Sequence, residues 1–445
     1  MQEIVINYLA RPSSRCRPLD PVSRLLSTAT RGTIYRRSCA ALLVRRFADL
    51  LCGRKGESWM KIEPFALERW MTTYETRVRY DIAESGIFPL SLQELLAMEP
   101  AGERDQTLQS LLDLRLGYNE ANGTLALREQ LAATYRDCGP ENILVTTGAI
   151  EANFLLFNVL LSPGDHVVAP YPAYQQLYSV PRALGCEVDL WRIRPETGFA
   201  YDVDDLERLL RPTTRLIVVN SPHNPTGAML SAADLERIYA LAESVGATLM
   251  SDEAYRWLVL PGGQELPQPV YNLGPLGISV GTLSKPLGLP GLRTGWIAAP
   301  AELVARCWAT RDYVSLSPGK LNDALARLAL RHREGVFRRN AGIMAANLAA
   351  ANAWIAEHHD LVSWTPPRAG LLALLRFNLD LPSYELANRL AEEYSVMLAP
   401  GAAFGVESHL RIGIGQDPPV FAAGLEATSR CFADLQAGGV GLAGR

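Results

Sequence analysis

Short apolar runs and longer amphipathic stretches alternate along the middle of the chain. The apolar runs have the length of core strands, and they cover residues 143–147, 167–169, 216–220, 248–250 and 278–282. The stretches between them, such as residues 232–245, have apolar residues at helical spacing. Buried strands that alternate with helices are typical of a mostly parallel sheet with helices on both faces. We therefore predict an α/β fold whose ligands bind at the carboxyl ends of the strands.

The pattern differs on both sides of this region. Residues 65–74 have the spacing of an amphipathic helix, which we expect to end near the turn at residues 84–86. After about residue 313 a smaller α+β domain is predicted, with a long helix at 322–356, an apolar run at 371–377, a helix at 384–394 and a strand at 410–414. The predicted segments are an extension at 1–59, an N-terminal arm at 60–100, a large domain at 101–312 and a small domain at 313–435.

The first 59 residues stand apart in charge. They hold eleven basic and four acidic residues, a net charge of +7 within a chain of −4, which leaves −11 for residues 60–445. This composition resembles an organellar transit peptide, and a true start at Met60 would explain it equally well. We expect no role for the extension in the mature protein.

Composition excludes several classes of function. The 445 residues are 48% hydrophobic, enough for a large core without disulfides or a structural metal. A net charge of −4 provides no basic face for nucleic acid, and no apolar run approaches the length of a membrane span. The seven cysteines form no CxxC pair, which favours a reducing cytoplasm. These features predict a cytoplasmic globular enzyme.

Lys285 is the strongest candidate for lysine chemistry. The chain has only four lysines, and this one directly follows the apolar strand at 278–282. Burial at a strand end lowers the pKa of an amine and makes it a nucleophile. Thr282, Ser284 and Arg293 surround it in sequence and supply two hydroxyls and a guanidinium, which suit a phosphate dianion.

A second phosphate feature is the junction from strand to helix at Gly148, Ala149 and Ile150. The free backbone N–H groups at the start of a helix favour an anion there. One glycine turn is weak support by itself, because many such turns need glycine only for packing. A phosphate site, a reactive lysine and one acid would together make a site for pyridoxal phosphate.

Asp252 is that acid, at the end of the strand at 248–250. A carboxylate there could keep a pyridine nitrogen protonated and so make the ring an electron sink. Tyr255 and Asn224 could donate to the phenolic oxygen of the ring, and Tyr174 could stack on its face. Arg411, inside an otherwise apolar strand, needs an anion, and a substrate carboxylate is a suitable partner.

These motifs together resemble the fold type I pyridoxal-phosphate enzymes, specifically the class I and II aminotransferases. The similarity extends from about Tyr118 to Ile414. Its most specific parts are Asn-Pro-Thr-Gly at 224–227, Ser-Asp-Glu-Ala-Tyr at 251–255, Ser-Lys at 284–285 with Arg293 eight residues later, and the strand with Arg411. The resemblance implies a large domain with a mostly parallel, seven-stranded type of sheet and a smaller α+β domain.

The resemblance also implies a role for each matching residue. Lys285 would form the internal aldimine and move the proton at the substrate Cα, with Asp252 and Tyr255 as further catalytic residues. Arg411 would bind the substrate α-carboxylate, assisted by Asn224. Tyr118 matches a tyrosine that reaches the phosphate in the neighbouring subunit, so a homodimer is implied. The cofactor-binding set is Gly148, Ala149, Ile150, Tyr174, Asn224, Asp252, Tyr255, Thr282, Ser284, Lys285, Arg293 and Tyr118.

We expect an aminotransferase, and the alternative is a dehydratase and cyclase of a hydroxylated arginine. The family resemblance implies an aminotransferase that acts on an L-amino acid and a 2-oxo acid, and no second arginine supports a dicarboxylic substrate. Residues 281–296 and 311–318, however, are more similar to capreomycidine synthase-like enzymes, which dehydrate and cyclise a hydroxylated arginine. Both reactions begin with deprotonation at Cα, so the cofactor residues do not separate them. A regulator that keeps the fold as a sensor is disfavoured, because the first 59 residues do not have the pattern of a helix-turn-helix.

Overall fold

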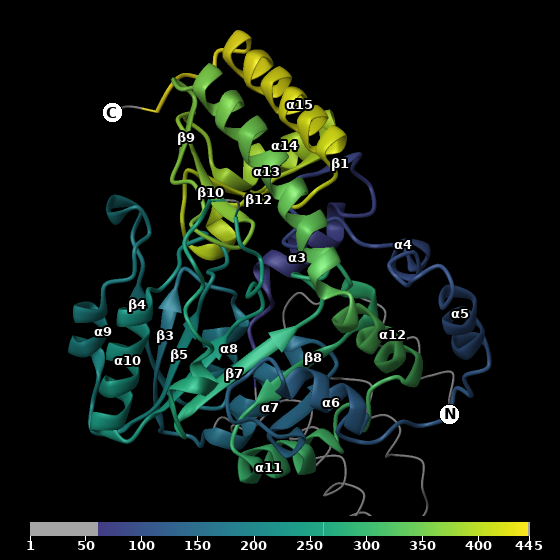
Figure 1. Ribbon diagram of the computed structural model, residues 1–445. Helices are drawn as coiled ribbons and strands as arrows, with labels where there is room; N and C mark the ends of the chain where they lie inside the picture. The colour runs from purple at the N-terminus through teal and green to yellow at the C-terminus, as the bar shows by residue number, and fades with distance from the viewer. Residues whose placement is uncertain (1–60, 261, 444–445) are drawn as a thin grey trace, which may run out of the picture. The chain divides into compact units, whose positions relative to one another are not determined.

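A computed structural model describes residues 61–260 and 262–443 (Figure 1). The predictions for the extension at 1–59 lie outside the described residues. The described residues form one compact unit. Among the described helices, none has both the length and the apolar character that crossing a membrane requires.

A seven-stranded sheet forms the centre of the unit, in the order β2-β8-β7-β6-β5-β3-β4. All neighbouring strands run parallel except β8, which is antiparallel to both β2 and β7. The predicted mostly parallel sheet is confirmed. The strands are β2 (Ile143–Thr146), β3 (His166–Tyr171), β4 (Glu187–Arg192), β5 (Thr214–Asn220), β6 (Thr248–Asp252), β7 (Gly277–Thr282) and β8 (Gly295–Ala298).

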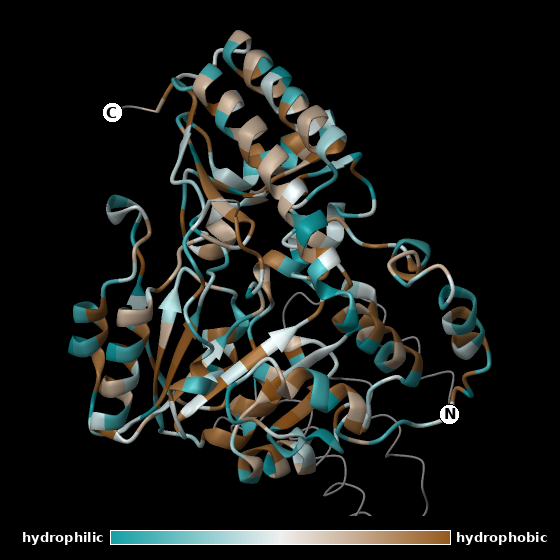
Figure 2. Ribbon diagram, in the orientation of Figure 1, coloured by the Kyte–Doolittle hydropathy of each residue, from teal (hydrophilic) through white to brown (hydrophobic). Residues whose placement is uncertain are grey.

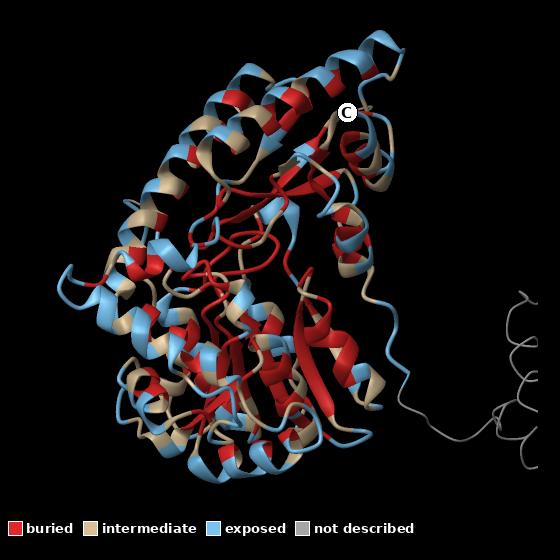
Figure 3. Ribbon diagram, turned by 90° about the vertical axis from the view of Figure 1, so that its right-hand side faces the viewer, coloured by how far each residue is buried: buried red, intermediate tan, exposed pale blue. Residues whose placement is uncertain are grey.

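Helices cover both faces of this sheet because alternate residues of each strand face opposite sides. In β5, Leu216 and Val218 pack in the apolar cluster with α7 (Ala149–Leu160), α8 (Gln176–Ala183) and α11 (Ala301–Arg311). Ile217 and Val219 pack on the other side with α9 (Val203–Leu209) and α10 (Ala232–Val245). Figures 2 and 3 show the resulting apolar, buried strands between partly exposed helices. The helix α6 (Leu125–Ala132) covers the β2 and β8 edge.

The N-terminal helix is shorter than the sequence predicts. Helix α3 (Ala66–Tyr74) ends at Tyr74, not near Glu84, because the chain then enters β1 (Tyr80–Asp81). This strand pairs in parallel with β11 (Val396–Met397), so its backbone hydrogen bonds go to a distant segment. Two helices follow, α4 (Leu92–Leu96) and α5 (Arg104–Leu112).

The C-terminal part contains a second, antiparallel sheet in the order β12-β13-β10-β9. Its strands are β9 (Val362–Trp364), β10 (Leu372–Phe377), β12 (Ala399–Pro400) and β13 (His409–Gly413). The predicted helix at 322–356 is in fact two helices, α12 (Lys320–Arg331) and α13 (Arg333–Glu357), which meet at His332. Helices α14 (Ser383–Tyr394) and α15 (Pro418–Ala437) complete this part; the sequence pattern did not reveal α15. The boundaries of the predicted domains stay a prediction.

Five short 3-10 helices connect these elements. They are η1 (Pro140–Asn142), η2 (Pro195–Thr197), η3 (Val270–Leu273), η4 (Pro290–Leu292) and η5 (Gly401–Phe404).

Candidate active site

A cavity of about 540 Å³ opens at the carboxyl ends of the central strands. Asn220 ends β5, Asp252 ends β6 and Thr282 ends β7, and all three side chains line it. The structure therefore brings together residues that are far apart in the sequence. All the predicted site residues except Tyr118 and Arg411 line this cavity: Gly148, Ala149, Ile150, Tyr174, Asn224, Asp252, Tyr255, Thr282, Ser284, Lys285 and Arg293.

Lys285 projects from the turn after β7 toward the loop that follows β1. Its Nζ donates to Ser85 Oγ at 2.8 Å and lies 3.3 Å from Glu84 Oε1. Burial alone lowers the pKa of Lys285, but the Glu84 carboxylate and Tyr255 outweigh burial, and the net effect is a raised pKa. The expectation of a lowered pKa from burial is thus wrong for this side chain. Its ionic partner, Glu84, lies 201 residues away in the sequence. The local motif around Lys285 did not reveal this partner.

Asp252 is held by hydrogen bonds on both carboxylate oxygens. Asn153 Nδ2, from helix α7, donates to Oδ2 at 2.9 Å, and the Ala254 backbone N–H donates to Oδ1 at 3.1 Å. Burial raises the pKa of Asp252, because only 5% of the residue is exposed. A cationic N–H brought next to this carboxylate would stabilise its ionised form. The site therefore fits a protonated pyridine nitrogen.

The end of the cavity at helix α7 fits a phosphate group. Gly148, with a positive φ of 82°, precedes the helix, and no side chain caps the helix N-terminus. A Cβ at this position would meet Arg293 Nη2 at 2.8 Å, so glycine allows the guanidinium to lie against the turn. The hydroxyls of Thr282 and Ser284 are 3.0 Å apart and line the same cavity. Free helix N–H groups, two hydroxyls and a guanidinium are the donors that a phosphate dianion requires.

Tyr174 lines the cavity, and Arg411 lies behind it. Tyr174 packs its ring against Phe65 of the arm, with centroids 4.8 Å apart, and its hydroxyl donates to Glu68 Oε1 at 3.2 Å. Arg411 is 1% exposed and does not line the cavity itself. Its Nη1 donates to Asn224 Oδ1 at 3.3 Å, and Asn224 does line the cavity.

Arg411 also has unused donor capacity. Its Nη2 donates to the Ala83 carbonyl oxygen at 2.8 Å, whereas its Nε is buried without a partner among the described residues. A buried guanidinium with a free donor fits a carboxylate ligand.

Tyr118 lies outside the cavity of its own chain. It is 86% exposed, and the structure brings it to none of the other predicted site residues within one protomer. Its role at a neighbouring subunit stays a prediction.

Several site residues were not predicted from the sequence. Glu68 of helix α3, Ser85 after β1, and Asn153 and Asn220 line the cavity, and Glu84 reaches it through Lys285. Asn220 ends a buried strand, and this position in the sequence could have identified it as a site residue. The others have no local motif, since folding of the arm and helix α7 over the sheet brings them there.

Comparison with known proteins agrees with this geometry. A sequence model of the family "Aminotransferase class I and II" matches residues 101–426. The chain is 35% identical over 364 residues to capreomycidine synthase from Streptomyces vinaceus, an alignment that covers 82% of this chain and 92% of that protein. A solved structure of a PLP-dependent aminotransferase from Streptococcus suis is 35% identical, with a TM-score of 0.80 and coverage of 84% of this chain and 98% of that one. The PLP-dependent cyclase OrfR is 33% identical, with a TM-score of 0.76 and the same coverages.

The family match includes the strands, the lysine turn and the phosphate cradle described above. The fold is the fold type I architecture of these enzymes, and the cofactor is pyridoxal phosphate. The chain belongs to the class I and II aminotransferase family.

Proposed function

We propose that this protein is a pyridoxal-phosphate enzyme that dehydrates and cyclises an L-arginine carrying a hydroxyl on Cβ. The observation that carries this proposal is the contact of Glu84 and Ser85 with Lys285 Nζ. Transamination needs one amine that moves a proton. A carboxylate and a hydroxyl that are hydrogen-bonded to that amine can help it to protonate a leaving group.

The described residues would hold the cofactor at both ends. The helix N-terminus from Gly148 to Ile150, with Thr282, Ser284 and Arg293, would bind its phosphate. Asp252 would pair with its ring nitrogen, Asn224 and Tyr255 would donate to its phenolic oxygen, and Tyr174 would lie against its ring. When bound, pyridoxal phosphate supplies an electron sink that makes the Cα proton of an attached amino acid acidic.

Lys285 would take the Cα proton and so become an ammonium group. The Glu84 carboxylate raises the pKa of Lys285 despite the opposing effect of burial, which keeps that proton on Nζ until the Cβ hydroxyl departs with it as water. A guanidine nitrogen then bonds to Cβ and gives a proton to Lys285, which has lost its own proton to the departing water, and Lys285 would return this proton to Cα. The net change is loss of one water.

Two acids, beside the basic lining residues Arg69, Lys285 and Arg293, support an arginine-type substrate. Glu68 lines the cavity. Glu84 is paired with Lys285, which also lines the cavity. The ammonium group of Lys285 lowers the pKa of Glu84, and the Arg411 guanidinium lowers it further. The Glu84 carboxylate is therefore ionised at neutral pH. Arg411 would bind the substrate α-carboxylate, and the two acids would attract the side-chain guanidinium.

Transamination of an L-amino acid is the second candidate. The family match and the name of the Streptococcus suis relative support it. It uses the same cofactor residues and the same removal of the Cα proton, without expulsion of a hydroxyl.

The test incubates the purified, cofactor-loaded protein with 3-hydroxy-L-arginine in the absence of a 2-oxo acid. We expect a product lighter by one water in mass spectrometry, while the cofactor keeps its aldehyde absorbance. L-Arginine with pyruvate serves as the parallel reaction. Stoichiometric conversion of the cofactor to its amine form, with release of a 2-oxo acid and no dehydrated product, would replace cyclisation by transamination.

A further inference from the structure

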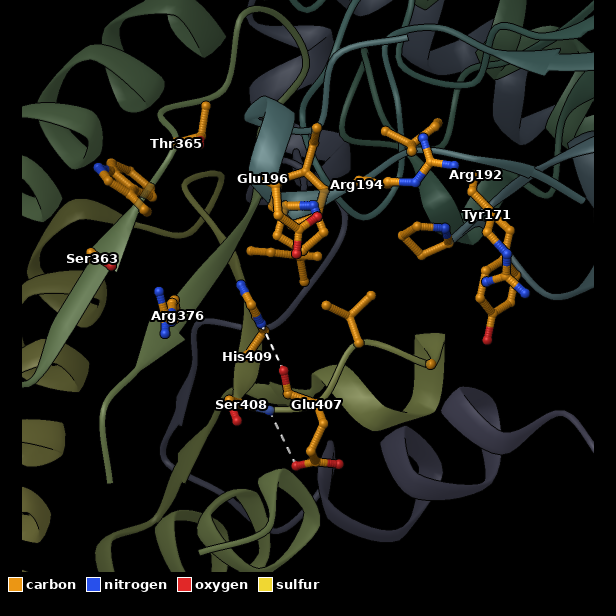
Figure 4. A pocket seen from close by; sticks show the side chains of 18 residues that line it. Tyr171, Arg192, Arg194, Glu196, Ser363, Thr365, Arg376, Glu407, Ser408 and His409 are labelled. Carbon is orange, nitrogen blue, oxygen red and sulfur yellow. Dashed lines mark hydrogen bonds between the residues drawn. The ribbon is translucent and has the colours of Figure 1, made fainter. Parts of the chain in front are cut away.

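A second cavity, of about 660 Å³, shares no lining residue with the candidate active site. One wall comes from the ends of β3 and β4 and from η2 in the central-sheet part of the chain. The other wall comes from β9, β10 and the start of β13 in the antiparallel sheet. Figure 4 shows side chains from both walls converging on this space. Concave sites with a few converging polar groups are where small ligands bind.

The walls carry more positive charge than the fold itself neutralises. Arg192 and Arg194 lie on one side and Arg376 on the other (Figure 4). Arg194 pairs with Asp205 at 2.8 Å. Among the described residues, no carboxylate lies within 4.0 Å of the guanidinium of Arg192 or Arg376. Two guanidinium groups on opposite walls therefore have no ionic partner among the described residues, and that of Arg192 lies over the Tyr171 ring, 5.5 Å from its centroid.

Arg376 is an exposed residue on the wall of this cavity. It lies within β10, with His409 of β13 and Ser363 of β9 as its cross-strand neighbours. Burial lowers the pKa of His409 and the Arg376 guanidinium lowers it further, so the imidazole is neutral and gives Arg376 no charge repulsion. The side chains of Arg376 and His409 both line the cavity.

The two carboxylates of the cavity differ in availability. Glu407 accepts hydrogen bonds from the backbone N–H groups of Ser383 and Ser408, so it is committed to the start of helix α14. Glu196 is exposed, forms no ion pair among the described residues, and lies between Arg376 and Arg192 in the view of Figure 4. The floor is apolar, with Phe199 and Leu374 buried in one cluster.

We propose that this cavity is a binding site for a short-chain dicarboxylate, in which Arg192 and Arg376 each bind one carboxylate and Glu196 faces an amino group if the ligand carries one. The methylene groups of such a ligand would lie on the floor formed by Phe199 and Leu374. Two guanidinium groups and one carboxylate complement the charges of an acidic amino acid.

Isothermal titration of the full, cofactor-loaded chain with glutarate, L-glutamate and inorganic phosphate tests the site. Saturable binding of glutarate or L-glutamate, tighter than that of phosphate, is expected. Tighter binding of L-glutamate than of glutarate would support the role of Glu196. We expect Arg192→Gln and Arg376→Gln each to weaken the dicarboxylate at least about 10-fold. Arg338→Gln removes another exposed arginine, outside the cavity, and should leave binding unchanged.

Fluorescence of Trp364, which lines the cavity, locates the ligand independently. A saturable change in tryptophan emission should accompany binding and disappear in Trp364→Phe, while titration calorimetry still detects the ligand. The proposal fails if no dicarboxylate saturates the protein, if both arginine variants bind as the wild type does, or if the emission change survives in Trp364→Phe. Melting temperatures of the variants close to that of the wild type would establish that each one folds.

Discussion

At the scale of single residues, Asp252 is a buried carboxylate with a hydrogen bond to each of its two oxygens. Burial raises its pKa, while Asn153 and the Ala254 N–H hold both oxygens in place. We expect Asp252→Asn to keep the covalently linked cofactor, seen in its visible absorbance, and to lower kcat about 100-fold or more, because the negative charge at the ring nitrogen is lost. Lys285→Ala is the matched comparison and should lose the covalent linkage itself. An Asp252→Asn protein with near-normal kcat would contradict the assignment.

Asp81 gives a prediction about pH. Burial and then the Glu84 carboxylate raise the pKa of Asp81 to about 6. Between its ordinary pKa of 3.8 and this value, the folded protein holds a proton that the unfolded chain has released, so this group's stabilisation is lost as pH rises. Asp81→Asn should therefore gain stability relative to the wild type as pH rises from about 4 to 6.

Urea unfolding of the cofactor-free proteins at several pH values measures this difference. Asp105→Asn, at an exposed position on helix α5, is the control and should follow the wild type throughout. A constant difference between Asp81→Asn and the wild type over this pH range would refute the buried titration of Asp81.

At the scale of elements, the N-terminus of helix α7 is held by a buried charge pair. Glu151 accepts a hydrogen bond from the Thr147 N–H, and Arg311 Nε of helix α11 lies 3.9 Å from its carboxylate. Arg311 is 0% exposed and also donates to the Ala121 carbonyl oxygen and to Ser315 Oγ. This pair therefore connects helix α11 to the loop that contains Gly148.

Glu151→Gln should loosen that loop. It leaves Arg311 without its buried ionic partner, a change that typically costs about 3–5 kcal/mol of folding free energy. We expect a lower melting temperature and at least about 10-fold weaker binding of pyridoxal phosphate, measured by equilibrium dialysis. Glu129→Gln, at an exposed position of helix α6, should change neither quantity. Weakened folding with unchanged cofactor affinity would show that the pair does not position the phosphate loop.

At the scale of the whole molecule, apolar side chains are exposed around the segment of Tyr118. Leu112 is 70% exposed, Leu116 79%, Tyr118 86% and Tyr313 93%. Exposed apolar groups in such number mark a contact surface, and the family resemblance implies that a second copy covers them. Sedimentation equilibrium should therefore give twice the mass of one chain.

We expect the same surface to link assembly to cofactor binding through Tyr118. Tyr118→Phe removes only a hydroxyl, so we expect the dimer to persist while pyridoxal phosphate binds about 3- to 10-fold more weakly. A monomer in solution, or a dimer whose affinity for the cofactor is unaffected by the variant, would contradict the role of Tyr118 at the neighbouring site.

The sequence by itself determined that the central sheet is mostly parallel, located five of its seven strands and marked residues at their carboxyl ends; it did not reveal β4 and β8. Lys285, Asp252 and Thr282 each follow or end an apolar strand, and parallel strands bring such positions to one edge. Short apolar runs, which are buried on both faces of the sheet, and local turn chemistry carry that information within a few residues. Arg411 was marked in the same way, as a charge within a buried strand.

Only the tertiary structure decided what surrounds those residues. The end of helix α3 depends on the pairing of β1 with β11, and the raised pKa of Lys285 depends on Glu84, both contacts between segments hundreds of residues apart. Asn153 reaches Asp252 across 99 residues of sequence, and the arginines on the two walls of the second cavity also come together only in the folded chain. A carboxylate acts on an amine through distance and burial, and neither exists until the chain has folded, so the contact of Glu84 with Lys285 emerged only from the folded site.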